Sequence, residues 1–197
     1  MSKKVFVIGG GVDASNYKNY EDYLNKLEFN PYEIDEKRWK DNLGEDLGEG
    51  FEVIRIPMPN KRFAEYKYWK IMFEKALKYF SDFDILVGHS NGAIFLLKYL
   101  NENKFEKDIF AIHLIAPASQ NTPNEKLGSF KFDKKLESFR KYENITNFYF
   151  SEDDEVVPFK QCLDLQKILK DSKYNIFQDK GHFRMQHFEE LVENIKK

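Results

Sequence analysis

The chain has 197 residues and a formal charge of −2, which results from 31 basic and 33 acidic residues. This near balance argues against a nucleic acid or an anionic membrane as the main partner, because both favour a basic surplus. Apolar residues make up 42% of the chain, which argues against global disorder and suits one domain over residues 1–197. The single cysteine, Cys162, excludes an intramolecular disulfide.

Hydrophobic segments are short along the whole chain. The apolar run after Lys4 dissolves into glycines, so it does not resemble a signal peptide. The most apolar stretch, Ala93–Leu97, is far too short to span a bilayer. We therefore expect a cytoplasmic protein.

Six segments rich in β-branched or aromatic residues are predicted to be strands. In chain order they are Val5–Ile8, Phe51–Ile56, Asp84–Val87, Ile109–Ala116, Asn147–Phe150 and Tyr174–Phe177. Apolar residues at helical spacing predict helices over 63–80 and 165–169 between the strands and over 188–195 after the last one. The stretch 93–97 is apolar all round, which indicates a helix buried against the sheet. This alternation predicts an α/β fold, a three-layer sandwich in which a mostly parallel sheet of about six strands carries helices on both faces.

Two connections are longer than this alternation needs. They cover residues 28–50 and 117–142. Long connections in compact α/β domains often form lids or pocket walls. The alternative is an additional surface helix in each of them.

A catalytic motif follows the third predicted strand. Residues Gly88–Gly92 read Gly-His-Ser-Asn-Gly and match G-x-S-x-G between a buried strand and a buried helix. A sharp turn there would expose the hydroxyl of Ser90 at the carboxyl edge of the sheet. We therefore predict Ser90 to be a nucleophile, the alternative being an ordinary strand–helix turn with a serine cap.

A serine nucleophile needs a base and an acid that orients the base. Asp153 and Asp154 follow the fifth predicted strand, and His182 follows the sixth. The order Ser, Asp, His is that of α/β hydrolases, and all three positions follow strand ends. The sequence thus predicts a triad of Ser90, His182 and one of the two aspartates.

An oxyanion hole is expected beside the serine. The backbone N–H of Asn91 would supply one donor, and the loop Gly10–Val12, with Gly11 between, would supply the other. His89, Trp39 and Trp69 are candidates for the substrate pocket, although aromatic residues at helical spacing more often belong to a core. The triad needs no metal or organic cofactor, and the acidic cluster Glu152–Glu155 lacks a spaced set of metal ligands.

Other functions are compatible with parts of this pattern. Gly9, Gly11 and Ala14 fit a dinucleotide-binding fingerprint, but the second strand ends in Arg55 where an acidic residue should hold a ribose. A binding protein with a vestigial site on a hydrolase scaffold is a further alternative, since fold does not dictate function.

The motifs together resemble the α/β-hydrolase superfamily. Within it the chain is similar to the small serine hydrolase family of retinoblastoma-binding protein nine and its bacterial relatives. The family pattern D-x-x-[VL]-P aligns with Asp154–Pro158, so the resemblance implies that Asp154 is the triad acid. It also implies hydrolysis of a small-molecule substrate, for which we expect a carboxylic ester, with a thioester or an amide as alternatives. The segment 28–50 and the side chain of Asn91 depart from the family pattern.

Overall fold

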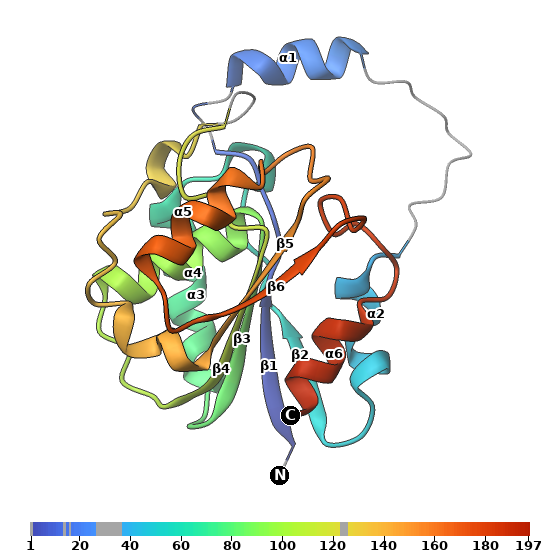
Figure 1. The fold of residues 1–197 in the computed structure, drawn as a ribbon, viewed down its shortest axis with the longest axis vertical. Coiled ribbons are helices and arrows are strands. Elements are labelled where there is room, and N and C mark those ends of the chain that lie inside the picture. The colour runs from blue at the N-terminus through green and yellow to red at the C-terminus, as the bar shows by residue number, and fades with distance from the viewer. Residues whose placement is uncertain (1, 14, 16, 27–36, 123–125) are drawn as a thin grey trace.

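A computed structural model describes residues 2–13, 15, 17–26, 37–122 and 126–197. Six parallel strands form one sheet in the order β2-β1-β3-β4-β5-β6 (Figure 1). They are β1 (Lys3–Ile8), β2 (Phe51–Arg55), β3 (Asp84–His89), β4 (Ile109–Ile115), β5 (Thr146–Ser151) and β6 (Lys173–Phe177). All six predicted strands are confirmed. Their ends differ by one or two residues. Backbone pairing extends four of the strands beyond the predicted ends, whereas β2 and β4 each end one residue earlier.

Helices lie on both faces of this sheet, as predicted. The helices of the described residues are α1 (Tyr17–Lys26), which lies beyond the end of the sheet, α2 (Trp39–Leu47), α3 (Tyr66–Ala76), α4 (Asn91–Glu102), α5 (Lys160–Ile168) and α6 (Glu189–Lys196). Helices α3, α4 and α5 cover one face, and α2 and α6 cover the other (Figure 1). Short 3-10 turns occur at η2 (Lys61–Phe63), η3 (Leu77–Tyr79), η4 (Gly128–Phe130) and η5 (Arg140–Ile145).

The central strands are apolar on both faces because both faces are covered. Along β1, Phe6 and Ile8 pack into the core shared with α3, α4 and α5. Val5 and Val7 pack into the core that contains Trp39 and the residues of α6. Side chains alternate between the two faces of a strand, so one short apolar run contributes to both cores.

The two long connections differ in structure. Helix α2 lies within 28–50, and its residues Leu43 and Leu47 are buried in the core under β2 and α6. The described part of 117–142 contains the turn η4 and residues leading into η5, so the additional helix expected there is not found in that part. Buried apolar side chains such as Phe130 and Phe139 hold these turns against the sheet in place of a regular helix. Residues 27–36 and 123–125 lie outside the described residues, and a mobile lid stays a prediction.

The helices in the described ranges are short. The longest of them, α4, has 12 residues. A membrane-spanning helix needs about 20 apolar residues. No helix in these ranges is long and apolar enough to cross a membrane.

The sheet order creates a switch point between β1 and β3. From β1 the chain moves outward to β2, and from β3 it moves outward in the opposite direction. Ligands of open α/β sheets bind at such a point, beyond the carboxyl ends of the strands. The loop Gly9–Val12 follows β1 and Ser90 follows β3, so both lie where a site is expected.

Candidate active site

Ser90 occupies a strained turn between β3 and α4. Its backbone has φ 55° and ψ −123°, and its N–H donates to the carbonyl of Ile115 over 2.8 Å. Such a conformation costs about 1–3 kcal/mol in a residue other than glycine. The two motif glycines permit the turn, because a Cβ on Gly88 would lie 2.8 Å from the nitrogen of Ala93 and one on Gly92 would lie 2.7 Å from the carbonyl oxygen of Gly9.

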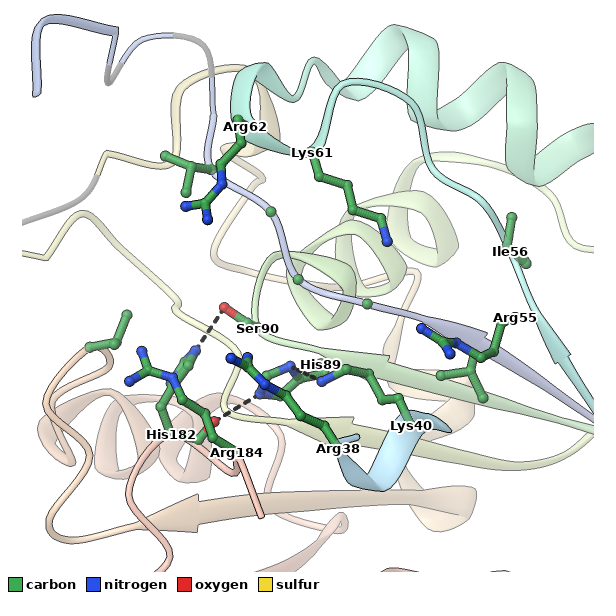
Figure 2. Close-up of a pocket in the computed structure, with 16 residues that line it drawn as sticks. Arg38, Lys40, Arg55, Ile56, Lys61, Arg62, His89, Ser90, His182 and Arg184 are labelled. Carbon is green, nitrogen blue, oxygen red and sulfur yellow. Dashed lines mark hydrogen bonds between the residues drawn. The ribbon is translucent and has the colours of Figure 1, made fainter. Parts of the chain in front are cut away.

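The predicted triad residues form a continuous chain of hydrogen bonds. His182 Nε2 lies 3.0 Å from Ser90 Oγ, and His182 Nδ1 lies 2.9 Å from Asp154 Oδ2 (Figure 2 shows the serine–histidine bond). His182 and Asp154 are both buried. A carboxylate at Nδ1 fixes the tautomer in which Nδ1–H donates to Asp154 and Nε2 accepts from the serine hydroxyl.

The two candidate aspartates have different partners. Asp154 Oδ1 also accepts the N–H groups of Val156 and Val157, both at 2.8 Å, which fixes its carboxylate toward the histidine. Asp153 instead accepts hydrogen bonds from the hydroxyl of Ser151 and, over 2.9 Å, from the N–H of Gly181. These bonds lower the pKa of Asp153. The structure therefore places Asp154 on the histidine ring and Asp153 on the loop that precedes the histidine.

Backbone donors for an oxyanion lie beside Ser90. A Cβ on Gly10 would lie 3.6 Å from Ser90 Oγ, so the glycine loop passes directly over the hydroxyl. Among the described residues, no backbone carbonyl accepts from the N–H of Gly10, Gly11 or Asn91. The expectation for Val12 is wrong, because its N–H donates to the carbonyl of Lys61 over 2.7 Å and is not available to a substrate.

The two tryptophans predicted as pocket candidates belong to the core instead. Trp39 and Trp69 are fully buried. Their indole N–H groups donate to the carbonyls of Phe183 and Pro59, over 3.0 and 2.9 Å. Trp69 supports the glycine loop from below, since a Cβ on Gly11 would lie 2.9 Å from its ring. Both rings therefore pack in the core and are not exposed to a pocket.

His89 does line the cavity in front of the serine, as predicted. Its Nε2–H donates to the backbone carbonyl of His182 over 3.0 Å, and its Nδ1 accepts from Lys40 Nζ at 3.1 Å. Burial and the nearby Lys40 ammonium hold the pKa of His89 well below its usual range. Burial, with the charge of Arg38, lowers the pKa of Lys40 to about 7.

The cavity in front of Ser90 has a volume of about 400 Å³ and contains a set of residues that sequence reasoning missed. Six basic side chains line it: Arg38, Lys40, Arg55, Lys61, Arg62 and Arg184 (Figure 2). Arg38 and Lys40 belong to a run of charged residues that is typical of a solvated helix face. The sequence therefore does not reveal that these two side chains line a cavity. The position of Arg184, two residues after His182, was the one available signal.

A second, narrow chamber opens on the other side of Ser90. It has a volume of about 20 Å³, and its apolar lining includes Ile94, Leu127 and Val157. The side chain of Asn91 also lines it, and its Nδ2 atom is buried without a hydrogen-bond partner among the residues that the structure describes. The serine thus lies between a wide basic cavity and a small one whose lining mixes apolar and polar residues.

Solved structures with the same arrangement of sheet and helices are α/β hydrolases. The crystal structure of the ydeN gene product from Bacillus subtilis matches with a TM-score of 0.69 at 19% identity, over all of both chains. The 2-hydroxy-6-oxo-6-phenylhexa-2,4-dienoate hydrolase BphD from Rhodococcus sp. strain RHA1 matches with a TM-score of 0.66 at 13% identity, over 100% of this chain and 91% of that one. The chain therefore has the α/β hydrolase fold.

Sequence comparison narrows this class to one family. The family model described as serine hydrolase matches residues 32–194, and the chain belongs to this family. The serine hydrolase RBBP9 of Rattus norvegicus is 26% identical over 150 residues, which are 75% of this chain and 77% of RBBP9. The YdeN protein of Bacillus subtilis (strain 168) is 26% identical over 143 residues, 70% of this chain and 73% of YdeN. The predicted family resemblance is confirmed.

Proposed function

We propose that this serine hydrolase cleaves small carboxylic esters through an acyl-enzyme on Ser90. The observation that carries the proposal is the hydrogen-bonded chain from Ser90 Oγ through His182 to Asp154. A serine hydroxyl is a weak nucleophile unless a base takes its proton, and the base works best when a carboxylate fixes its tautomer. Ser90 and Asp154 each lie within hydrogen-bonding distance of His182, as this chemistry requires.

In the first half of the reaction, Ser90 Oγ attacks the ester carbonyl while its proton moves to His182 Nε2. Asp154 stabilises the resulting imidazolium through the hydrogen bond from Nδ1–H. The oxyanion accepts hydrogen bonds from the N–H of Asn91 and from the Gly10–Gly11 backbone, and losing one such donor typically costs about 3–4 kcal/mol. When the carbon–oxygen bond breaks, His182 gives its proton to the departing alcohol.

In the second half, water takes the place of the alcohol. His182 accepts a proton from the water as it attacks the acyl carbonyl, and the same backbone donors hold the new oxyanion. Collapse then breaks the bond to Ser90 Oγ, which recovers a proton from His182. The acid leaves, and no step uses a metal or an organic cofactor.

The narrow chamber beside Ser90 supports a small group on one side of the scissile bond. A volume of about 20 Å³ holds little more than one methyl or one water. The buried, unpartnered Nδ2 of Asn91 adds a hydrogen-bond donor within it. We therefore expect esters with a short group on one side of the ester bond to be cleaved faster than esters with long groups on both sides.

A fluorophosphonate probe tests the proposal. We expect stoichiometric labelling of Ser90, identified by peptide mass spectrometry, together with hydrolysis of p-nitrophenyl acetate. Both activities should disappear in Ser90→Ala and persist in a matched control, Ser129→Ala, whose serine lies outside both cavities. A wild-type protein that neither reacts with the probe nor turns over the ester would favour a binding protein with a vestigial site.

A further inference from the structure

The cavity in front of Ser90 is lined by one kind of charge only. Its six charged lining residues are all basic, and among the described residues no acidic side chain lines it. The whole chain has slightly more acidic than basic residues. An even sample of its charged residues would therefore include both signs, so the lining is a local arrangement and does not reflect composition.

Carboxylates outside the lining neutralise only part of this charge. Arg55 forms an ion pair with Asp41, and Arg184 pairs with Glu155 over 2.8 Å. Arg38, Lys40 and Lys61 form no ion pair with any carboxylate in the part of the chain that the structure describes. Three cations without a counter-ion therefore remain around one cavity, where a low-dielectric wall strengthens their field.

These cations come from two elements that the sheet brings to opposite sides of the cavity. Arg38 and Lys40 belong to the start of α2, and Lys61 belongs to η2 (Figure 2). The positive charges of Arg38, Arg55 and Lys61 each act on the ammonium of Lys40, so each lies close enough to repel it, and Asp41 acts in the opposite direction. Like charges are held together at a cost, and a bound anion would relieve it.

The same cavity contains the reacting groups. Ser90, His182 and the backbone of Gly10 and Gly11 line it together with the cations. A ligand whose ester carbonyl lies at Ser90 would therefore extend between the side chains of Arg38, Lys40 and Lys61. An oxygen-rich anion matches their N–H donors, because charge-assisted hydrogen bonds are shorter and stronger than neutral ones.

From this arrangement we infer that the natural ester carries an anionic group, a carboxylate or a phosphate, which Arg38, Lys40 and Lys61 bind while Ser90 attacks the carbonyl. The inference rests on the proposed esterase function and specifies its substrate class. The anionic group belongs to the part of the ester that occupies the wide cavity, since the narrow chamber has a volume of only about 20 Å³ and includes the acidic residue Asp13 in its lining.

The test compares esters that differ only in charge. In the first pair, mono-p-nitrophenyl adipate carries a charge on the acyl part and p-nitrophenyl methyl adipate is its neutral partner. In the second pair, 5-acetoxy-2-nitrobenzoate carries the charge on the alcohol part and its methyl ester is the neutral partner. We expect the anionic member of one pair to have a kcat/KM at least about tenfold higher than its neutral partner at low salt. The preference should decrease in 0.5 M NaCl, because exposed cations are screened over a few ångströms at high salt.

Substitutions assign the preference to the cavity. Arg38→Gln and Lys61→Gln should each lower kcat/KM for the anionic ester about tenfold, and should lower kcat/KM for the neutral ester less. Arg140→Gln, an exposed arginine on η5, is the matched control and should change neither. Inhibition of neutral-ester hydrolysis by inorganic phosphate, compared with inhibition by adipate, distinguishes a phosphate from a carboxylate.

The outcomes separate the inference from the proposed function. Ser90 labelling without a preference for either anionic ester would overturn the inference alone. A preference that survives in both Arg38→Gln and Lys61→Gln would overturn it as well. Failure of Ser90 to react with a fluorophosphonate would reject the esterase function, and the inference with it.

Discussion

Lys40 Nζ lies 3.1 Å from His89 Nδ1, and the opposite ring nitrogen of His89 donates to the backbone carbonyl of His182. A chain of hydrogen bonds thus runs from the basic wall of the cavity to the backbone of the proposed general base. Because the pKa of Lys40 is lowered to about 7, its charge changes within the physiological range. Both the stability of the fold and the binding of an anion should therefore depend on pH through this residue.

We expect Lys40→Met to raise the free energy of unfolding, most strongly below pH 7. Burial lowers the pKa of Lys40 from 10.5 to about 7 in the folded protein, so between these values the unfolded chain binds more protons and wild-type stability rises with pH. Below pH 7 the cost of the buried charge is fully present. Denaturant unfolding at several pH values should show that the unfolding free energy of Lys40→Met exceeds that of wild type by an amount that decreases between pH 7 and 10. A gain that grows with pH would contradict this, and Lys104→Met, on an exposed lysine, should show no such trend.

The preference for an anionic ester should fall as pH rises through about 7. Lys40 loses its proton there in the free enzyme, and a neutral amine attracts an anion less. The charged and titratable groups around Lys40 are His89, Arg38, Asp41, Arg55 and Lys61. The measured quantity is the ratio of kcat/KM for the anionic and neutral esters of the pair that shows the preference, in which protonation effects common to both esters cancel. The ratio should become flat in Lys40→Met, and a ratio that rises with pH in wild type would refute the role of this charge.

Substitution of the two neighbouring aspartates should have unequal effects. Asp154→Asn removes the carboxylate that fixes the tautomer of His182, and comparable changes lower turnover roughly 10⁴-fold. Asp153→Asn keeps an oxygen that can accept from Gly181, so we expect a loss of about tenfold or less. Hydrolysis of p-nitrophenyl acetate measures both, with thermal melting as the check on folding. A larger loss in Asp153→Asn would show that the acid is wrongly assigned.

Alanine substitutions in the glycine loop should lower activity only where the added methyl group lies close to Ser90. A Cβ on Gly10 would lie 3.2 Å from the Cβ of Ser90, whereas one on Gly9 would meet only Lys40 Cδ at 3.9 Å. Overpacking by one methyl typically costs about 1–3 kcal/mol, so Gly10→Ala should lower kcat/KM for p-nitrophenyl acetate by about tenfold to a hundredfold. Gly9→Ala should remain within about twofold of wild type. Similar activity in the two variants would place the hydroxyl elsewhere.

Local patterns were enough to predict the elements that position the triad. A short run of β-branched or aromatic residues predicts each strand, and Ser90, Asp154 and His182 follow three of these runs. Residues outside such patterns could not be placed in this way. Nothing in the sequence near Val12 shows that its N–H is bonded to Lys61, a residue almost fifty positions away.

Trp39 is a second example of a residue whose environment local sequence patterns could not predict. Trp39 begins α2 within a segment whose charged residues are typical of a surface helix, yet its ring is fully buried and bonded to the carbonyl of Phe183. Its environment depends on the contact of α2 with α6, two helices that lie far apart in the sequence. A local sequence pattern can indicate that a residue lies in a helix. It does not indicate which distant segment will cover that residue.

By itself the sequence determined the order of strands and helices, the turn that holds Ser90, and the chain order of serine, acid and histidine. These features depend on residues within a few positions of one another, where hydrophobic period and glycine placement suffice. Only the tertiary structure decided that Asp154 faces the imidazole, that Val12 is occupied, and that Arg38, Lys40 and Lys61 surround one cavity. Those relationships join separate segments at the edge of the sheet, and their charges act through space rather than along the chain.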